Sequence, residues 1–279
     1  MPGFALAIVL AAAVLHASWN ALVKAAKDRA LVLAAVSSMH ALLGLTLVLF
    51  ATPPAAGSWP YIIASTIIHY GYYAFLFQSY RLGDLSQVYP ISRGLAPVLV
   101  AVGAYVTIGE TLSPAGWVGL IAISAGIGFL ALQRGAAHAD PRAVMAATTT
   151  GILIAAYSVI DGIGVRLSHS PFGYMGWLFL LEIPVSLFVL WRRRDDPHSF
   201  DWRTFRIGMI GGVCAVTAYG LVIYAKTIAP LGAVSAVRES SVIIAALIGL
   251  LLFGERPWLG RLASAAVVAG GVITLAFAG

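Results

Sequence analysis

Residues 89–110 read YPISRGLAPVLVAVGAYVTIGE, an apolar segment with one arginine near its start and Gly-Glu at its end. Residues 234–255, VSAVRESSVIIAALIGLLLFGE, hold an arginine and a terminal Gly-Glu in the same register, because Arg238 follows Arg93 by 145 positions. An arginine inside a hydrocarbon-spanning segment is costly. Its presence at equivalent places in two segments therefore indicates an internal duplication in which the arginines have a use.

The composition indicates a protein that spans a membrane several times. Of the 279 residues, 60% are hydrophobic and 10% are charged, whereas soluble domains carry roughly a quarter charged residues. The net charge of +6 does not indicate a nucleic-acid partner, because the basic residues lie in short loops between apolar runs. The single cysteine, Cys214, excludes an intramolecular disulfide.

Hydropathy predicts an all-α membrane protein with ten transmembrane helices, each close to the ~20 residues that cross ~30 Å of hydrocarbon. Five spans per half is an odd number, so the second half enters the membrane in the opposite orientation. This predicts two inverted five-helix repeats, residues 1–137 and 138–279, with a substrate site near the membrane midplane between them. The predicted spans are 4–24, 30–50, 60–80, 86–107, 115–133, 143–165, 171–191, 204–226, 231–253 and 259–278.

The distribution of Lys and Arg predicts the orientation in the membrane. Loops after the odd-numbered spans hold thirteen basic residues, whereas loops after the even-numbered spans hold two, Arg166 and Lys226. The first set is expected to face the cytoplasm of a bacterium, with both termini outside its inner membrane. These thirteen are Lys24, Lys27, Arg29, Arg81, Arg134, Arg142, Arg192, Arg193, Arg194, Arg203, Arg206, Arg256 and Arg261.

Ten spans in a duplication, with Gly-Glu closing the fourth helix of each half, resemble the drug/metabolite transporter superfamily, specifically its EamA-type branch. Local similarity lies in Tyr89-Pro90-Ile91, Leu252-Phe253-Gly254-Glu255 and Gly270-Gly271. The resemblance implies export or uptake of small metabolites, by proton-coupled exchange or facilitated passage. The departures from the commonest family pattern, which resemble a subset associated with phosphonate utilisation, are His16-Ala17-Ser18-Trp19-Asn20, Arg93 and Arg238-Glu239.

Arg93 and Arg238 are the predicted anion-binding residues. Inverted halves let both converge on one cavity, and a guanidinium offers a planar fork of donors that suits carboxylate or phosphonate oxygens. The alternative is that each arginine only neutralises a buried acid, with Glu239 and Glu182 as the candidates. Adjacent helix residues point about 100° apart, so Arg238 and Glu239 are not expected to pair directly.

Three acids, Glu182, Glu239 and Asp161, are predicted to supply charge balance or proton coupling. Pro184 follows Glu182 closely and removes a backbone donor, which is expected to open the helix locally. Asp161 lies near the end of its span, where a structural cap or a place at the cavity rim is expected. Glu110 is expected to fix its turn or to receive donors from the helix that follows, outside the substrate site.

The remaining predicted substrate-binding residues are aromatic or polar side chains at membrane depth: Trp19, Asn20, His69, Tyr73, Tyr89 and Tyr157. His69 and Tyr73 are four residues apart and share a helix face, from which Tyr72 is expected to turn away. An aromatic lining suits an organic metabolite or a cation. The sequence contains no motif for a metal or a cofactor.

These features predict a secondary transporter that moves a small polar metabolite, anionic or zwitterionic, by alternating access. Its expected partners are this substrate, membrane lipids and, as a candidate coupling ion, protons, and its expected state is a monomer or a homodimer. Two alternatives stay open. One is an intramembrane enzyme acting on lipid or peptide, for which no catalytic motif is recognisable. The other is a membrane scaffold whose buried charges only pair helices.

Overall fold

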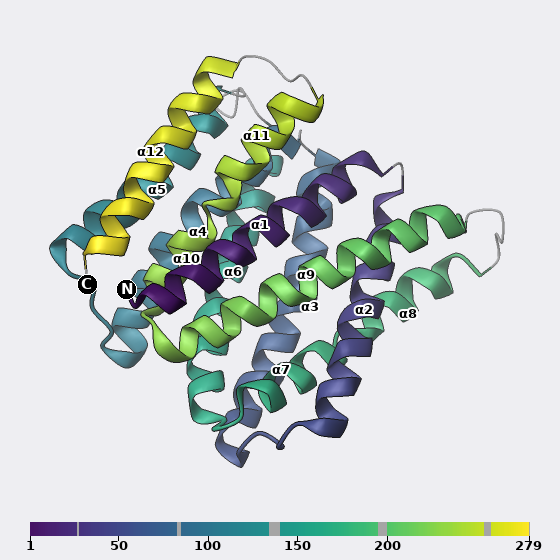
Figure 1. The fold of residues 1–279 in the computed structure, drawn as a ribbon. Coiled ribbons are helices and arrows are strands. Elements are labelled where there is room, and N and C mark those ends of the chain that lie inside the picture. The colour runs from purple at the N-terminus through teal and green to yellow at the C-terminus, as the bar shows by residue number, and fades with distance from the viewer. Residues whose placement is uncertain (27, 83–84, 134–139, 195–199, 254–257, 279) are drawn as a thin grey trace.

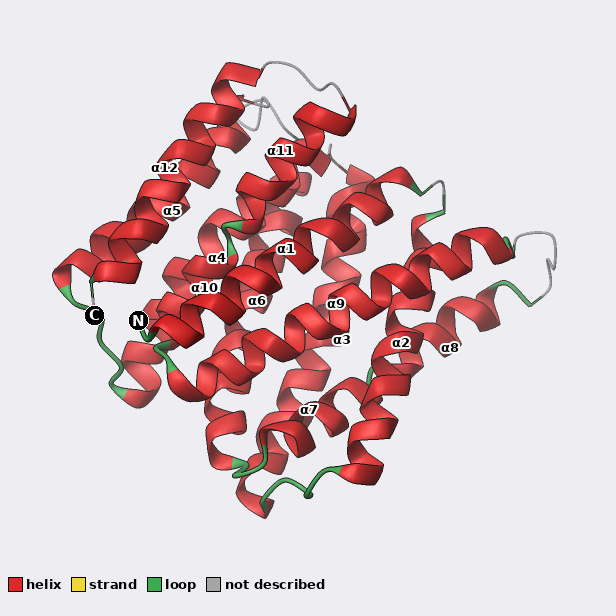
Figure 2. Cartoon of the chain, viewed as in Figure 1, coloured by secondary structure: helices red, strands yellow, loops and turns green. Residues whose placement is uncertain are grey.

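The computed structural model describes residues 1–279 except 27, 83–84, 134–139, 195–199, 254–257 and 279. The described residues form twelve α-helices, one short 3-10 helix and no strand, which confirms the all-α prediction (Figure 2). The helices are α1 Gly3–Ala25, α2 Arg29–Phe50, η1 Ala56–Ser58, α3 Trp59–Leu82, α4 Leu85–Ile108, α5 Pro114–Gln133, α6 Pro141–Leu167, α7 Pro171–Leu180, α8 Ile183–Arg192, α9 Trp202–Ile228, α10 Leu231–Arg238, α11 Ser241–Phe253 and α12 Trp258–Phe277.

Seven helical segments in the described part of the chain are long and apolar enough to cross a membrane. They are Gly3–Leu22, Ala30–Phe50, Val88–Ile108, Pro114–Gln133, Pro141–Leu167, Pro171–Arg192 and Trp202–Ile228, and they coincide with seven of the predicted spans. The other three predicted spans are helical as well, over α3, α10 with α11, and α12. Large apolar side chains such as Phe50 (85% exposed) and Val106 (74% exposed) lie on the surface, where lipid can cover them.

The predicted span 171–191 is interrupted at Leu181-Glu182, between α7 and α8. This confirms the predicted local opening before Pro184. The Val185 N–H donates to the Glu182 carbonyl at 3.0 Å, three residues back, and so leaves the Leu181 carbonyl without its usual helical donor. The Tyr70 hydroxyl donates to that carbonyl at 2.5 Å. A tyrosine of α3 thus satisfies the backbone group that the break exposes.

The sequence predicts one helix over 231–253, and here the structure differs. The chain makes a turn at Glu239-Ser240, where each N–H donates at 3.0 Å to a carbonyl three residues back. In a regular helix, adjacent side chains point about 100° apart. Because the turn changes this relation, Arg238 Nη2 comes within 3.5 Å of Glu239 Oε1. The expectation that Arg238 and Glu239 do not pair directly is therefore wrong, although the contact is long.

Helices of the two predicted repeats pack against each other in corresponding pairs. The first helix of each packs on the third of the other, α1 on α9 and α6 on α3. The fourth packs on the first, α4 on α6, and both α10 and α11 on α1. The fifth helices, α5 and α12, pack together through Gly119 and Gly271, since a Cβ at Gly119 would lie 2.7 Å from the Gly271 carbonyl oxygen.

The two ends of the bundle differ in charge. Figure 1 shows the N- and C-termini close together at one end, whereas α8 ends and α9 begins at the opposite end. The exposed Arg192, Arg203 and Arg206 lie at that opposite end.

Lys226, which the sequence places in a loop, instead lies inside α9 and is 1% exposed.

Candidate functional site

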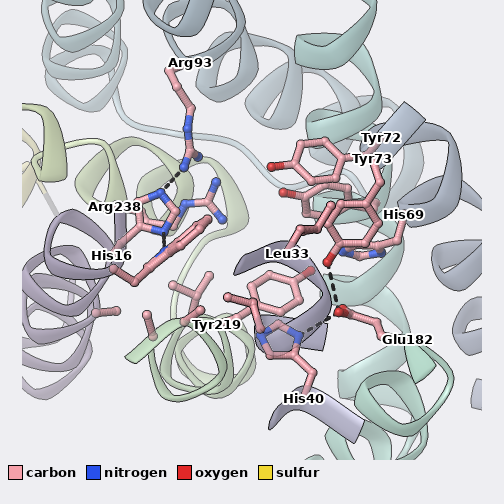
Figure 3. A pocket seen from close by; sticks show the side chains of 17 residues that line it. His16, Leu33, His40, His69, Tyr72, Tyr73, Arg93, Glu182, Tyr219 and Arg238 are labelled. Atoms are coloured by element: carbon pink, nitrogen blue, oxygen red, sulfur yellow. Dashed lines mark hydrogen bonds and ion pairs between the residues drawn. The ribbon is translucent and has the colours of Figure 1, made fainter. Parts of the chain in front are cut away.

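A cavity of about 90 Å³ lies between the two predicted repeats, where Arg93, Arg238 and His16 gather on one side and Glu182, His40 and Tyr73 on the other (Figure 3). This volume holds several water molecules but is well below the ~300 Å³ of a typical ligand site, so a metabolite requires the cavity to widen. The lining residues are Ala12, His16, Trp19, Leu33, Val36, His40, His69, Tyr72, Tyr73, Arg93, Tyr157, Glu182, Ala215, Ala218, Tyr219, Val222 and Arg238.

Arg93 and Arg238 meet at one carboxylate. Arg93 Nη1 donates to Glu239 Oε1 at 3.1 Å, and Arg238 Nη2 approaches the same oxygen at 3.5 Å. The arginines are 5% and 6% exposed, and Glu239 is completely buried. Two guanidinium cations therefore face one ionised carboxylate, which leaves this side of the cavity with a net positive charge.

His16 lies between two groups that can only donate hydrogen bonds. Trp19 Nε1 donates to His16 Nδ1 at 3.1 Å, and an Arg93 guanidinium nitrogen contacts His16 Nε2. A neutral imidazole accepts at only one of its nitrogens, whereas indole and guanidinium nitrogens never accept. One of the two donors therefore lacks an acceptor at any moment. This side of the cavity offers more hydrogen-bond donors than acceptors, as an anion-binding site would.

Glu182 lies opposite the arginines and has its own partners. His40 Nδ1 and Glu182 Oε2 are 2.7 Å apart, and the Tyr73 hydroxyl donates to the same oxygen at 2.9 Å. Glu182 therefore pairs with a histidine of α2 and not with an arginine. Of the two acids predicted as alternative partners of the arginines, only Glu239 contacts them. Nothing in the sequence singles out His40, because no pattern indicates that α2 lies against the α7–α8 break.

The aromatic lining combines predicted and unpredicted residues. The His69 ring stacks on Tyr157, with 4.1 Å between ring centroids, and both line the cavity. Tyr72 lines it too, so the expectation that Tyr72 turns away from the His69 face is wrong. Residues three apart on a helix are neighbours as much as residues four apart, which places Tyr72 beside His69. Tyr219 of α9 is a further lining residue, for which the sequence gives no signal.

Two predicted binding residues support the site from outside the lining. The Asn20 side chain donates at 2.7 Å to the His16 carbonyl, one turn back in α1. The Tyr89 ring lies under the Arg93 guanidinium, 5.3 Å from the ring centroid to the guanidinium carbon, at a distance that suits a cation–π contact. Both residues therefore hold neighbouring groups and do not face the cavity.

Asp161 is completely buried and does not lie at a rim or a helix cap. It accepts hydrogen bonds from the hydroxyls of Tyr174, at 2.9 Å, and Tyr219. Lys226 lies near by, with its Nζ donating to the Ser158 carbonyl at 3.0 Å and 5.9 Å from the Tyr219 ring centroid. Tyr219 thus connects this buried cluster to the cavity.

Glu110 joins the two predicted repeats at the end of the bundle that carries the termini. Gly109 ends α4 with a positive φ of 66°, which glycine adopts without strain. Glu110 then accepts from Arg166 Nη1 at 2.9 Å and from the Leu231 N–H at the start of α10. The expectation of donors from the helix that follows is therefore wrong, because Glu110 caps a helix of the other half. Glu255, its counterpart in the sequence, lies outside the described residues.

Arg166 reinforces the contact that Glu110 makes. Its Nε donates to the Lys226 carbonyl at 2.7 Å, and its Nη2 donates to the Ala229 carbonyl at 2.9 Å. These carbonyls end α9, whose last turn leaves them without helical donors. The Arg166–Glu110 pair therefore holds the ends of α4, α6 and α9 to the start of α10. Among the described residues, no three His, Cys, Asp or Glu side chains gather closely enough to hold a metal ion.

Comparisons with known proteins point to one family. Residues 141–277 match the model of the EamA-like transporter family. A solved crystal structure, described only as that of a protein, aligns with a TM-score of 0.76 and 18% sequence identity, and the alignment covers 98% of this chain and 96% of the other. At this identity the likeness shows a shared fold alone. A search of curated proteins finds no match to this sequence.

Proposed function

This chain belongs to the EamA-like transporter family of the drug/metabolite transporter superfamily, and on that premise we propose that it is a secondary transporter working by alternating access. Its proposed substrate is a small polar metabolite that is anionic or zwitterionic. Members of this family are membrane transporters and not enzymes, so neither the intramembrane enzyme nor the scaffold is favoured. The phosphonate-associated subset and the oligomeric state stay predictions.

The proposed topology is ten membrane crossings in two inverted repeats. The corresponding helix pairs described above support it, because a two-fold relation between repeats requires such reciprocal packing. The lining of the site supports the same relation. His16 of α1 contacts Arg93 of α4, and Tyr157 of α6 lines the same cavity as Arg238 of α10, so residues of the first and fourth helices of both repeats gather at the site.

One observation carries the proposed substrate class: two buried guanidinium groups, one from each repeat, share a single carboxylate at the wall of a cavity. If each arginine only neutralised a buried acid, the two arginines would need two acids. Here the surplus positive charge and the surplus donors beside His16 favour binding of an anionic group. Aromatic rings next to the arginines favour an organic substrate over a simple inorganic ion.

Ion pairs at both ends of the bundle suit a carrier that closes on either side in turn. The Arg166–Glu110 pair lies at the end that carries the termini. At the other end, Arg193 at the close of α8 binds Asp28, which precedes α2, through two hydrogen bonds of 2.5 and 2.8 Å. Alternating access requires these two pairs to open at different stages of the cycle. We propose that the end with Arg193 faces the cytoplasm, as the excess of basic residues there favours.

The proposal is tested by transport and binding measurements on purified protein. A thermal-shift screen of organic acids, amino acids, phosphonates and quaternary amines should yield hits with an anionic group. For such a hit, the R93A/R238A double variant in proteoliposomes should lose uptake while still inserting and folding. The matched control is R192A/R206A, which removes two exposed guanidinium groups outside the cavity lining. Uptake by R93A/R238A equal to that of the wild type would overturn the assignment.

A further inference from the structure

We infer that the Glu239 carboxylate occupies the place of the substrate's anionic group, so that the substrate binds by displacing this carboxylate from the two arginines. The inference rests on the proposed function, because it concerns the same site. The inference adds that Glu239 competes with the substrate for the two arginines and is not their permanent counter-ion.

The Glu239 carboxylate satisfies the hydrogen-bond donors of the two arginines only in part. Both arginines approach a single oxygen, Oε1, and the Arg238 contact is long at 3.5 Å. The other oxygen, Oε2, is buried and has no hydrogen-bond partner among the described residues, and the same is true of Arg238 Nε. Buried polar atoms without partners are costly. Glu239 therefore leaves Arg238 Nε unsatisfied.

A free anion can make the contacts that Glu239 cannot. Glu239 follows Arg238 directly in the chain, and its carboxylate makes one long contact with the neighbouring guanidinium in place of a bidentate pair. A carboxylate, phosphate or phosphonate that diffuses into the cavity has no such restriction and can present two oxygens to the guanidinium fork. Its oxygens would also accept from the donor that His16 leaves unsatisfied.

The position of Glu239 links such a displacement to the fold. Glu239 lies in the turn between α10 and α11, and its carboxylate accepts a hydrogen bond from Arg93 of the other repeat. Releasing its carboxylate therefore removes one link between the repeats at the point where the helix is already interrupted. Substrate binding and movement of the repeats are thus connected through one side chain, which acts as a positioning residue and not as a permanent part of the binding site.

The test is the sign of the change in anion affinity on substitution of Glu239. Purified wild type and E239Q are titrated with acetate and with inorganic phosphate by isothermal titration calorimetry. A neutral glutamine holds the arginines less strongly, so E239Q should bind both anions at least about tenfold more tightly. D140N is the matched control, since it removes an exposed carboxylate that caps α6 outside the cavity lining, and it should change affinity by less than about threefold.

The remaining outcomes separate this inference from the proposed function. Anion binding by the wild type, with unchanged or weaker binding by E239Q, overturns the inference and leaves the anion site in place. A gain in affinity of equal size in D140N also overturns the inference. No anion binding by the wild type overturns both. If E239Q does not fold, E239D keeps the charge and shortens its reach, and should show a smaller gain. In transport, E239Q should lower KM and lower turnover together, whereas a purely structural role would raise KM.

Discussion

His40 of α2 and Glu182 of the α7–α8 turn form a hydrogen bond of 2.7 Å between Nδ1 and Oε2, and neither residue is more than 6% exposed. These two elements are the second helices of the two proposed repeats. The bond therefore crosses the interface between the repeats, on the side of the cavity away from the arginines. When one repeat moves relative to the other, His40 and Glu182 must either move together or lose this hydrogen bond.

The first prediction concerns proton linkage at this bond. A carboxylate next to a histidine can take up and release a proton, whereas a carboxamide cannot titrate. E182Q should therefore lose the response of uptake to a pH gradient while retaining substrate exchange between the two sides of the membrane. Proteoliposomes with an imposed pH gradient, compared with counterflow under equal pH, measure the two activities separately.

The control for this variant is S186A, which removes a hydroxyl of α8 that donates to the Ala34 carbonyl at 2.7 Å. It changes the same helix and the same interface without removing the titratable group, so its response to pH should equal that of the wild type. E182Q proteoliposomes that still follow the pH gradient would assign Glu182 to charge balance alone.

The second prediction concerns the pair that closes the end with the termini. R166Q removes the ion pair with Glu110 and weakens the bonds to the ends of α9. In a C214A background, a cysteine introduced as A218C at the cavity should then react at least about fivefold faster with a membrane-impermeant maleimide added from that side. R192Q, an exposed arginine at the opposite end, should leave the rate unchanged. Equal rates in R166Q and R192Q would remove the closing role of this pair.

The sequence predicted the helical class and the register of the two arginines, because apolar runs and rare charges are visible without knowledge of packing. It also predicted the break before Pro184, since proline lacks the N–H that a helix interior requires. The break at Glu239-Ser240 has no such signal. It lies beside Arg238 and Glu239, which meet Arg93 at one carboxylate oxygen. That contact is a property of the packed structure.

The partners of the site residues depended on how each helix is rotated and against which helix it lies. His16, His40 and Tyr72 gave no sequence signal that they face the cavity rather than lipid, because a chain that is apolar on all sides lacks the polar face that orients a soluble helix. Lys226 was placed in a loop because it closes an apolar run. Its burial beside Asp161 depends on the packing of α6 against α9.

The third prediction tests the close contact between the fifth helices of the repeats. A Cβ at Gly271 would lie 2.6 Å from the Gly119 carbonyl oxygen, whereas a Cβ at Gly270 would meet nothing within 4 Å. G271A should therefore lower the free energy of unfolding by about 1–3 kcal/mol, the usual range for overpacking. G270A adds the same methyl group and should leave stability unchanged or raise it, since alanine favours helices by up to about 1 kcal/mol over glycine. Thermal unfolding midpoints in one detergent compare the two, and similar losses in both would contradict the close packing.

The fourth prediction concerns pH and the opposite end of the bundle. Asp28 caps α2 by accepting from the Leu31 N–H at 3.0 Å, and both of its oxygens accept from Arg193. Burial opposes ionisation of this carboxyl, but the hydrogen bonds from Arg193 and Leu31 outweigh it and hold the pKa of Asp28 below its ordinary value. Because the pKa is lower in the folded state, the stabilisation is fully present above the unfolded value of about 3.9. It is lost as pH falls through the folded value.

D28N keeps an oxygen for the cap and removes the charge, so at pH 7 it should be less stable than the wild type by no more than about 1 kcal/mol, because both partners are partly exposed. The difference should shrink once the pH falls below about 4, when the wild-type carboxyl is also protonated. The control is D140N, in which an aspartate caps α6 through the Arg142 N–H and should show a smaller dependence on pH. Chemical unfolding at pH 7 and pH 3 makes the comparison. A D28N deficit of equal size at both values would contradict a stabilising role for the charge on Asp28 in its pair with Arg193.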